Sequence, residues 1–465
     1  MLHETEPPRS GDGAEIYGLT WPGKTAARAL AEAPARARFT ALDGRPAHPD
    51  RNAVIEGDSL VALKVLARTH AAAFDLIYAD PPYNSGTCAD YRDDFRRSQA
   101  SEDRAARGRE ASGARSSAGR RHSLWLDLMY PRLLLARELL DASGVVAISI
   151  DDHEAPRLRL LLDEVFGEEC FVATVVWEKK YAPANDAKGF SAVHEYILIY
   201  ASPGRSWGLL PRTERMDRPY RHDDGDGRGR YRASDLSVRT YRADRDYPVV
   251  NPSTGRAHRP PKGRSWSVSR EAMERLIAQG RIYWGATGTS GPQLKRYLSD
   301  VRPGVVPTTL WGREAAGHTH GARAELRKLF GTTGVFETPK PVELMQRLLR
   351  VATGPESMVL DFFAGSGTTA HAVMRQNAVD GGRRGVVLVQ NGERVDARRK
   401  PEIAADYPRI IDVTRERVRR SAAAISREFP GWAPPTFANL RLCDEPEGSL
   451  ANVQDGELYQ RKHIH

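Results

Sequence analysis

The sequence lacks the cysteines that a disulfide framework or a structural zinc site would require. Its 465 residues contain three cysteines, and these are widely spaced: Cys88, Cys170 and Cys443. Zinc sites and disulfide-rich domains are recognised by closely spaced cysteine pairs or by an even-numbered set. Because neither pattern is present, we expect a reducing compartment and a chain long enough to fold on its hydrophobic core alone.

Long hydrophobic runs are also missing. No stretch approaches the roughly 20 apolar residues of a membrane-spanning helix, and residues 1–13 are polar and acidic rather than signal-like. We therefore expect a cytoplasmic protein without a membrane partner. The 69 lysines and arginines exceed the 60 acids and give a net charge of +9, which suits a polyanionic partner but is common elsewhere.

What the chain does contain is a series of short apolar runs closed by turn residues. They cover residues 53–58, 74–80, 145–152, 171–177, 196–200, 358–365 and 386–390. Helical patterns lie between several of them, at 59–73 and at 124–144, where Gly144 is expected to end the helix. This alternation predicts an α/β fold with a mostly parallel sheet covered on both faces. Ligands bind at the carboxyl ends of such strands, where the runs place Asp58, Asp80, Asp151 and Asp361.

Two segments depart from this alternation. Residues 96–121 are rich in Arg, Ser, Ala and Gly, which predicts a mobile, solvated loop in preference to a flap that touches DNA. Residues 203–300 are rich in Arg, Tyr, Gly and Pro with weak periodicity, which predicts an inserted, irregular lobe. Interleaved arginines and tyrosines can bind phosphates and stack on bases, and they are also ordinary surface residues. Composition alone leaves both interpretations open.

A glycine turn follows the apolar run at 358–365. In VLDFFAGSGTTAHAVMRQ, Asp361 ends a strand, Gly365 and Gly367 form a turn, and a helix opens at Thr368. Such a turn offers free backbone amides to a ligand. No lysine follows the glycines as in a phosphate loop, and the third glycine of the dinucleotide fingerprint is absent. An acid before the turn suits a ligand with a positive amine or a ribose, and S-adenosylmethionine has both.

The sequence DPPY, at 80–83, ends another apolar run. The exocyclic amine of adenine is a poor nucleophile, so it needs acceptors for both hydrogens to turn its lone pair toward a methyl donor. The Asp80 carboxylate and the carbonyl of Pro81, held by the rigid Pro81–Pro82 turn, offer these acceptors, and Tyr83 offers a ring face. A plain strand-end turn is the alternative.

Together, DPPY and DFFAGSGTT resemble the amino-methyltransferases of DNA, which share a Rossmann-like sheet that binds S-adenosylmethionine. DPPY precedes the glycine turn by about 280 residues, as in the circularly permuted, β-class subgroup. Seven further stretches, from about residue 17 to about 418, resemble modification subunits of type III restriction-modification systems and their solitary relatives. They are TWPGK (20–24), IEGDSLVALKVL (55–66), WLDLMYPRLLLARELL (125–140), AISIDDHE (147–154), HEYILIY (194–200), GHTHGARAELRKLFG (317–331) and FETPKPVELMQRLL (336–349).

The resemblance implies a site-specific DNA methyltransferase that uses S-adenosylmethionine to methylate the N6 amine of a flipped adenine. It further implies double-stranded DNA, a restriction (nuclease or helicase) subunit and a homodimer as partners. Cytosine-N4 methylation is the nearest alternative, although those enzymes more often have serine in place of Asp80. A non-catalytic recognition subunit of a nuclease complex is a second alternative, which the intact DPPY disfavours, and RNA is a weaker substrate candidate.

The resemblance also assigns residues. The target adenine would be held by Asp80, Pro81, Pro82 and Tyr83, and the methionine end of the cofactor by Asp361, Phe363, Gly365, Ser366, Gly367 and Thr368. Asp58 would accept from the cofactor's adenine amine or cap a helix. Thr338 and Lys340 would close over the cofactor's carboxylate. Gln390, with Glu393 three residues on, stands where relatives bind the ribose through an acid.

The remaining candidates have plainer interpretations. His318 and His320 are expected at the surface or in packing, because no other ligands accompany them and the reaction needs no metal. His194 is expected to be a hydrogen-bonded structural residue, and Trp177 and Phe190 to be core residues in preference to stacking partners for a flipped base.

The expected domain organisation follows from these assignments. It comprises an N-terminal extension (1–50), a catalytic half with the mobile loop 96–121 (51–202), an inserted target-recognition region (203–335), a cofactor-binding half (336–425) and a C-terminal tail (426–465).

Overall fold

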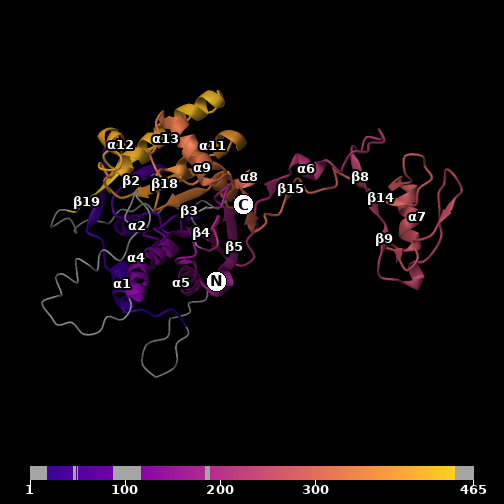
Figure 1. Ribbon diagram of the computed structural model, residues 1–465, viewed down its shortest axis with the longest axis horizontal. Coiled ribbons are helices and arrows are strands. Elements are labelled where there is room, and N and C mark those ends of the chain that lie inside the picture. Colours follow the sequence, from indigo (N-terminus) through magenta and orange to yellow (C-terminus); the bar gives the residue numbers. More distant parts are fainter. Residues whose placement is uncertain (1–17, 45–48, 50, 87–116, 184–188, 446–465) are drawn as a thin grey trace, which may run out of the picture. The chain divides into compact units, whose positions relative to one another are not determined.

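The computed structural model describes residues 18–44, 49, 51–86, 117–183 and 189–445. The chain divides into two compact units, drawn in Figure 1. The first, here called the sheet unit, comprises the residues up to Gly208 and those from Thr308 onward. The second, the arginine-rich unit, comprises Leu209–Pro307.

A ten-stranded mixed sheet organises the sheet unit. Its order is β1 (Ala37–Ala41), β19 (Ala438–Asp444), β2 (Asn52–Glu56), β18 (Gly385–Gln390), β17 (Met358–Asp361), β3 (Phe74–Ala79), β4 (Leu140–Ile150), β6 (His194–Ala201), β5 (Phe171–Glu178) and β16 (Leu310–Trp311). The strands from β19 to β4 run parallel, whereas β1 and β6 are antiparallel to their neighbours. The predicted mostly parallel α/β sheet and its seven predicted strands are confirmed.

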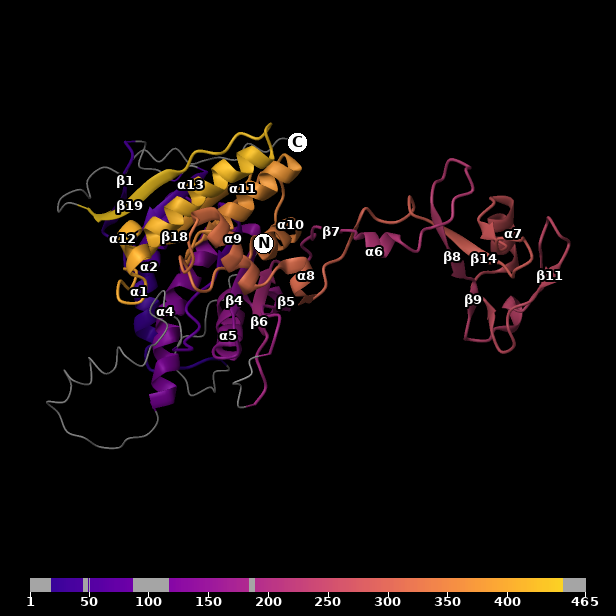
Figure 2. The ribbon, with the colours of Figure 1, turned by 45° about the horizontal axis from the view of Figure 1, so that its top comes forward.

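Helices cover both faces of this sheet, as Figure 2 shows. On one face lie α1 (Lys24–Glu32), α2 (Ser59–Ala67), α4 (Ser117–Leu139) and α5 (Ala155–Phe166). On the other lie α9 (Thr319–Phe330), α10 (Val342–Ala352), α11 (Thr368–Asp380) and α13 (Ile410–Glu428). Strands buried on both faces account for the continuous apolar runs in the sequence, such as GVVLVQ in β18.

The predicted end of one helix at Gly144 is wrong. Helix α4 ends at Leu139, and β4 begins at the next residue, where Leu140 pairs with Phe74 of β3. Sheet pairing therefore replaces the helix five residues before the glycine. The first turns of α4 also occupy residues 117–121, so this end of the predicted mobile loop 96–121 is helical; residues 96–116 lie outside the described residues.

Both ends of the described chain contribute to the sheet. Strand β1, within the predicted N-terminal extension, pairs with β19, within the predicted C-terminal tail, and β19 pairs in turn with β2. Strand β1 buries alternate residues and β19 buries Leu440, so Phe39 and Leu440 join the main hydrophobic core. Within the described ranges, no helix has the length and apolar character needed to cross a membrane.

The arginine-rich unit has short elements and a small core. It contains a three-stranded sheet of β13 (Ile282–Tyr283), β14 (Gln293–Tyr297) and β8 (Tyr231–Asp235), the pairs β7 (Leu210–Pro211) with β15 (Gly304–Val305), β9 (Ser237–Val238) with β12 (Ser265–Trp266) and β10 (Val249–Val250) with β11 (Ala257–His258), and helices α6 (Glu214–Asp217) and α7 (Arg270–Ala278). Its buried cluster consists of Leu236, Tyr247, Val249, Trp266, Met273 and Ile282. The unit lies within the predicted insertion 203–335, whose residues 308–335 instead belong to the sheet unit.

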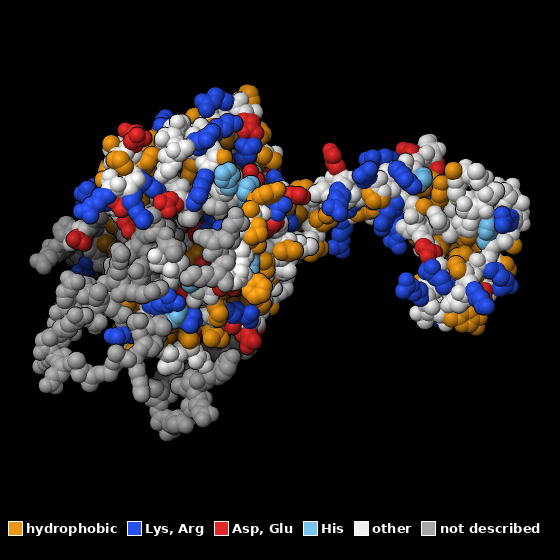
Figure 3. Space-filling model, viewed as in Figure 1, with side chains coloured by type: hydrophobic (Ala, Val, Ile, Leu, Met, Phe, Trp, Pro, Cys, Tyr) orange, Lys and Arg blue, Asp and Glu red, His pale blue; other side chains and the backbone are white. Residues whose placement is uncertain are grey.

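Charge is divided unequally between the two units. Residues 209–307 contain 20 lysines and arginines against 11 acids, a net charge of +9. The other residues contain 49 of each, so the arginine-rich unit accounts for the whole net charge of the chain. Figure 3 shows many Lys and Arg side chains and fewer acids on the visible face of this unit.

Candidate functional site

A cavity of about 660 Å³ opens in the sheet unit where β3, β17 and β18 end. Its lining brings together residues of both predicted halves, including Asp58, Asp80, Pro82, Thr338, Lys340, Asp361, Phe363, Gly365, Ser366, Thr368, Gln390 and Glu393. Asp151 is not among the lining residues; its carboxylate instead contacts Nδ1 of His153 at 2.9 Å. Three of the four strand-end acids therefore meet at one edge of the sheet, as the carboxyl ends of parallel strands do.

The glycine turn between β17 and α11 has the geometry that its sequence demands. Gly365 and Gly367 have φ angles of 52° and 83°, in the left-handed region that favours glycine. A Cβ on Gly367 would lie 3.2 Å from the side chain of Thr414. The turn is fixed from outside as well, because the Gly365 N–H donates to Oε1 of Gln390 at 2.8 Å. Gln390 thus holds the turn through one of its own polar atoms.

A buried arginine also stabilises the turn through hydrogen bonds. Arg417 of α13 is fully buried and donates from Nη1 to the hydroxyl oxygens of Ser366, at 2.8 Å, and Thr368, at 2.7 Å. Burial lowers the pKa of Arg417 to about 10, against the attraction of Glu325, so the guanidinium remains charged at neutral pH. Arg417 is not among the site residues predicted from the sequence.

The carboxyl group of Asp361 has a pKa close to neutral pH. Its oxygens accept from the Thr369 hydroxyl at 2.5 Å and from the Phe363 N–H at 3.1 Å. Burial raises the pKa of Asp361 to about 7, although these two hydrogen bonds oppose the shift. A cation brought to this carboxyl group would favour its ionised form.

Asp80, at the end of β3, belongs to a cluster of buried charges. Lys340 Nζ donates to both Asp80 oxygens, at 2.7 and 2.6 Å, and to the Tyr83 hydroxyl at 3.0 Å. The Tyr83 hydroxyl donates to Asp80 Oδ1 at 2.8 Å and lies 3.2 Å from Oε2 of Glu195, a residue of β6. Lys179 Nζ bonds the other Glu195 oxygen at 2.6 Å. Two carboxylates thus face two ammonium groups.

Burial and neighbouring charge act in opposite directions within this cluster. Burial raises the pKa of Asp80, against the attraction of Lys340. Burial acts on Glu195 in the same sense, but Lys340 and Lys179 outweigh it and lower the pKa of that carboxyl group. The pKa of Lys340 is raised, because the two carboxylates outweigh its desolvation. The charged forms of Lys340 and Glu195 are therefore favoured within the cluster, whereas for Asp80 burial outweighs the attraction of Lys340.

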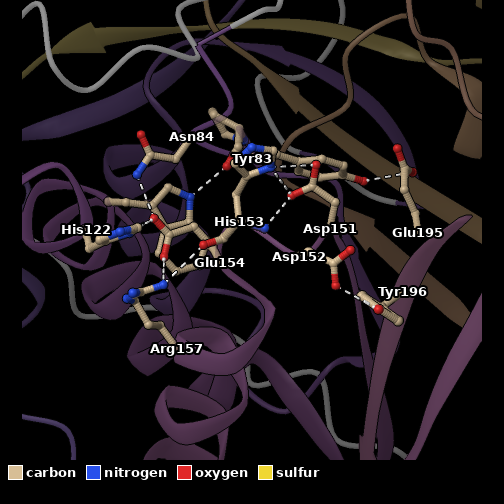
Figure 4. A network of polar contacts seen from close by, with 12 residues as sticks. Tyr83, Asn84, His122, Asp151, Asp152, His153, Glu154, Arg157, Glu195 and Tyr196 are labelled. Carbon is tan, nitrogen blue, oxygen red and sulfur yellow. Dashed lines mark hydrogen bonds and ion pairs between the residues drawn. The ribbon is translucent and has the colours of Figure 1, made fainter. Parts of the chain in front are cut away.

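The segment after DPPY is fastened to the helices beneath it. Asn84 has a left-handed φ of 60°, and its Nδ2 donates to Oε1 of the fully buried Glu154 at 2.6 Å. His122 of α4 contacts the same oxygen at 2.5 Å, and Figure 4 shows Glu154 between these two partners. The Trp125 indole donates to the carbonyl of Pro82 at 2.6 Å. These contacts fix the corner that carries Asp80.

Asp58 caps helix α2, which is one of the two roles predicted for it. Its Oδ1 accepts from the N–H groups of Leu60 and Val61, at 2.9 and 3.2 Å. Its Oδ2 pairs with Arg132 Nη2 at 2.9 Å, and the side chain remains 55% exposed at the cavity. Capping therefore leaves the carboxylate accessible to a ligand.

The other candidates lie elsewhere. His318 precedes α9, its ring stacked 6.3 Å from that of His320, and His194 Nε2 contacts the Tyr196 hydroxyl at 2.9 Å. Trp177 is a core residue, as predicted, whereas the core interpretation of Phe190 is wrong because its side chain is fully exposed. None of these residues lines the cavity.

Comparison with known proteins agrees with this arrangement. A family described as DNA methylase, of the N6/N4 type, matches residues 74–379. The chain is 36% identical to the type III restriction-modification enzyme StyLTI Mod subunit of Salmonella typhimurium, over 88% of this chain and 62% of that protein. It is 33% identical to the EcoPI Mod subunit of Escherichia phage P1, over 87% and 68%. It is 30% identical to the type II methyltransferase M.KpnI of Klebsiella pneumoniae, over 83% and 90%.

These matches cover both the DPPY corner and the glycine turn, the two parts that meet in the cavity. The chain spans less than two thirds of the length of the StyLTI Mod subunit and most of the length of M.KpnI. The chain belongs to the N6/N4 DNA methylase family.

Proposed function

We propose that this protein is a site-specific DNA methyltransferase that methylates the N6 amine of an adenine rotated out of the duplex, with S-adenosylmethionine as the donor. The observation that carries this proposal is the meeting of Asp80 and Asp361 in one cavity, although they are separated by 280 intervening positions. Asp80 suits a neutral amine that donates hydrogen bonds, and Asp361 suits a ligand with a positively charged amine.

The cavity residues fit S-adenosylmethionine by their donors and acceptors. Asp361 and the glycine turn suit the methionine amine and carboxylate, because the turn precedes the N-terminus of α11. Glu393 lines the cavity near the end of β18 and offers an acceptor for ribose hydroxyls, since Gln390 is engaged with the turn. Asp58 offers an acceptor for the cofactor's adenine amine. When bound, the cofactor supplies a methyl group on a positively charged sulfur.

The DPPY corner suits the target amine. Asp80 provides one acceptor and the carbonyl of Pro81 a second, and no donor among the described residues bonds that carbonyl. In the reaction the nitrogen lone pair forms the bond to the methyl carbon, the carbon–sulfur bond breaks with its electrons on sulfur, and nitrogen loses one proton. Rotating the base out of the stack costs about a few kcal/mol, which contacts with DNA must supply.

We assign DNA contacts and target recognition chiefly to the arginine-rich unit. Its net charge of +9 suits the phosphate backbone. Several of its arginines lie over tyrosine rings, such as Arg228 over Tyr297 at 4.8 Å. Binding by such a unit will weaken steeply as salt is raised.

The likeness to Mod subunits supports a role as the modification component of a restriction-modification system in the cytoplasm, with a restriction subunit and a second copy of the chain as partners.

Sequencing of native DNA from cells that express the chain tests the proposal, because it identifies the modified base and its context together. We expect N6-methyladenine at one sequence, and no modification with Asp80→Asn. The matched control is Asp151→Asn, which changes a strand-end acid outside the cavity. N4-methylcytosine would contradict the choice of base, and an unmodified genome with the intact chain would contradict the activity.

A further inference from the structure

Lys340 occupies the position that the target amine must take. Its ammonium group donates to both Asp80 oxygens, at 2.7 and 2.6 Å, and to the Tyr83 hydroxyl. Only 9% of its side chain is exposed. An adenine amine needs the same carboxylate as its hydrogen-bond acceptor. The amine and the lysine therefore compete for Asp80, and one must leave when the other binds.

The ammonium cannot simply move into solvent. Its departure would leave the Asp80 and Glu195 carboxylates buried with Lys179 alone to balance them. Removing one partner of a buried ion pair is strongly destabilising, because it leaves an uncompensated charge away from water. Lys340 must therefore stay within the cluster when the neutral base enters.

Glu195 offers the second position. Its Oε2 lies 3.6 Å from Lys340 Nζ, so a shift of about 1 Å would bring the two within hydrogen-bond distance. Its other oxygen is engaged by Lys179 at 2.6 Å, which leaves Oε2 for Lys340 and the Tyr83 hydroxyl. The strand β6 thus places a second carboxylate within 3.6 Å of the Lys340 ammonium.

We propose that Lys340 is a positioning residue that pairs with Asp80 while the base pocket is empty and transfers to Glu195 when the amine of the target base arrives. This inference rests on the proposed function and deepens it. It assigns Glu195 and Lys340 to the base side of the site, whereas the family resemblance associates Lys340 with the cofactor's carboxylate.

The transfer also prepares Asp80 for the proton that nitrogen loses. The groups facing Asp80 are Tyr78 on its own strand, Tyr83, Asp361 on β17, and Lys340 with Glu195 and Lys179 beyond it. Lys340 is the cation in direct contact. Once it has moved to Glu195, the Asp80 oxygens are more basic, and one of them accepts the proton as the new bond forms.

Glu195→Gln tests the transfer. The assay uses the full chain and an unmethylated duplex that carries the recognition sequence found by sequencing native DNA. The neutral amide of this variant no longer attracts the ammonium, so Lys340 stays on Asp80. We expect single-turnover methylation to slow about 10- to 100-fold, with the dissociation constant for S-adenosylmethionine unchanged. An unchanged rate would overturn the proposal.

A second test measures how the single-turnover rate of Lys340→Met depends on pH. Without the ammonium, burial and the charge of Glu195 raise the pKa of Asp80 further, against the Tyr83 hydrogen bond, so the acid limb of the single-turnover rate should move to higher pH. Lys340→Arg should restore the limb toward that of the wild type. A larger dissociation constant for S-adenosylmethionine with an unmoved acid limb would instead place Lys340 on the cofactor and overturn the proposal.

The double variant separates coupling from general damage. If Glu195 acts through Lys340, adding Glu195→Gln to Lys340→Met should slow the reaction little further, whereas additive losses would contradict the proposal. Lys64→Met, which changes a lysine bonded to the Ala33 carbonyl, is the matched control and should behave as the wild type. A wild type without methylation would refute the proposed function itself, whereas an active wild type with an unaffected Glu195→Gln variant refutes only the transfer.

Discussion

The two units of this protein use charge in opposite ways. In the sheet unit positive and negative charges are equal in number, and several are buried in paired clusters such as Asp80 with Lys340. In the arginine-rich unit arginines exceed acids, and many lie at the surface around a core of six buried residues. Buried, paired charge fixes geometry, as chemistry requires, whereas surplus surface charge attracts a polyanion with little geometric demand.

The largest effect is expected from disrupting the core of the arginine-rich unit and measuring whether the sheet unit still binds S-adenosylmethionine. Trp266 is almost fully buried, and its indole donates to the Tyr247 carbonyl at 2.9 Å. Trp266→Ala should cost about 3–5 kcal/mol, enough to unfold so small a core. We expect DNA binding to be lost and S-adenosylmethionine affinity, measured by calorimetry, to be kept. Loss of both would show that the units do not fold separately.

The next largest effect is expected from Asp361→Asn, which should weaken the binding of S-adenosylmethionine by the sheet unit. Asp361→Asn removes the charge that faces the proposed cofactor amine, and a charge-assisted hydrogen bond is worth about 1.5–3 kcal/mol. The dissociation constant should therefore rise about 10- to 100-fold, with DNA affinity unchanged. Because the pKa of Asp361 is about 7, wild-type affinity should fall as the pH drops below 7, and the variant's should not. A wild type without this pH dependence would contradict the assignment.

A smaller effect is expected from two arginines of the second unit. Arg232 and Arg296 are exposed and face each other across β8 and β14, and neither has an acidic partner within the described residues. Facing like charges destabilise a sheet unless an anion lies between them. Changing both to Gln should weaken DNA binding about tenfold and lower the salt slope by about 1–2. The matched control is Arg242 with Arg245, both paired with Asp244.

The smallest effect concerns stability. The folded state holds the Asp361 proton up to a pH of about 7, whereas the unfolded chain releases it near the ordinary aspartate pKa of 3.8. Wild-type stability should therefore fall as the pH rises from 4 to 7. Asp361→Asn should melt a few degrees above the wild type at pH 8, and the difference should vanish near pH 4. An equal difference at both pH values would point to packing instead of charge.

Much of the fold could be predicted because buried parallel strands are apolar throughout. Strands β1 and β19 were missed. In β1 the sequence ARFTA buries alternate residues, whereas in β19 the sequence ANLRLCD buries only Leu440. Strand β1 has five residues and lies at the sheet edge, and β19 has one buried position among seven, so neither shows a continuous apolar run. The arginine-rich unit, 209–307, lies close to the irregular lobe predicted from composition at 203–300, whereas residues 308–335 of the larger predicted insertion belong to the sheet unit.

The candidate site was predictable where residues act through local sequence and not where they act through distant contacts. DPPY and the glycine turn carry their backbone requirements within a few positions. Glu195, Lys179 and Arg417 act only through partners more than 10 positions away. One signal was available for Glu195: it is an acid near the start of the otherwise apolar strand HEYILIY. Arg417 follows Ile410, Val413 and Thr414 at helical spacing, which places it on the buried face of α13. The local sequence does not show that its partners are Ser366 and Thr368.

The position of β17 between β3 and β18 bears on how the chain is made. During synthesis β3 emerges from the ribosome long before β17, so one edge of a very apolar strand must wait for about 280 residues of nascent chain. Unpaired strand edges invite association with other chains. The newly made protein should therefore depend on holding chaperones until β17 is released, and a product truncated before β17 should lack the Asp361 side of the cavity.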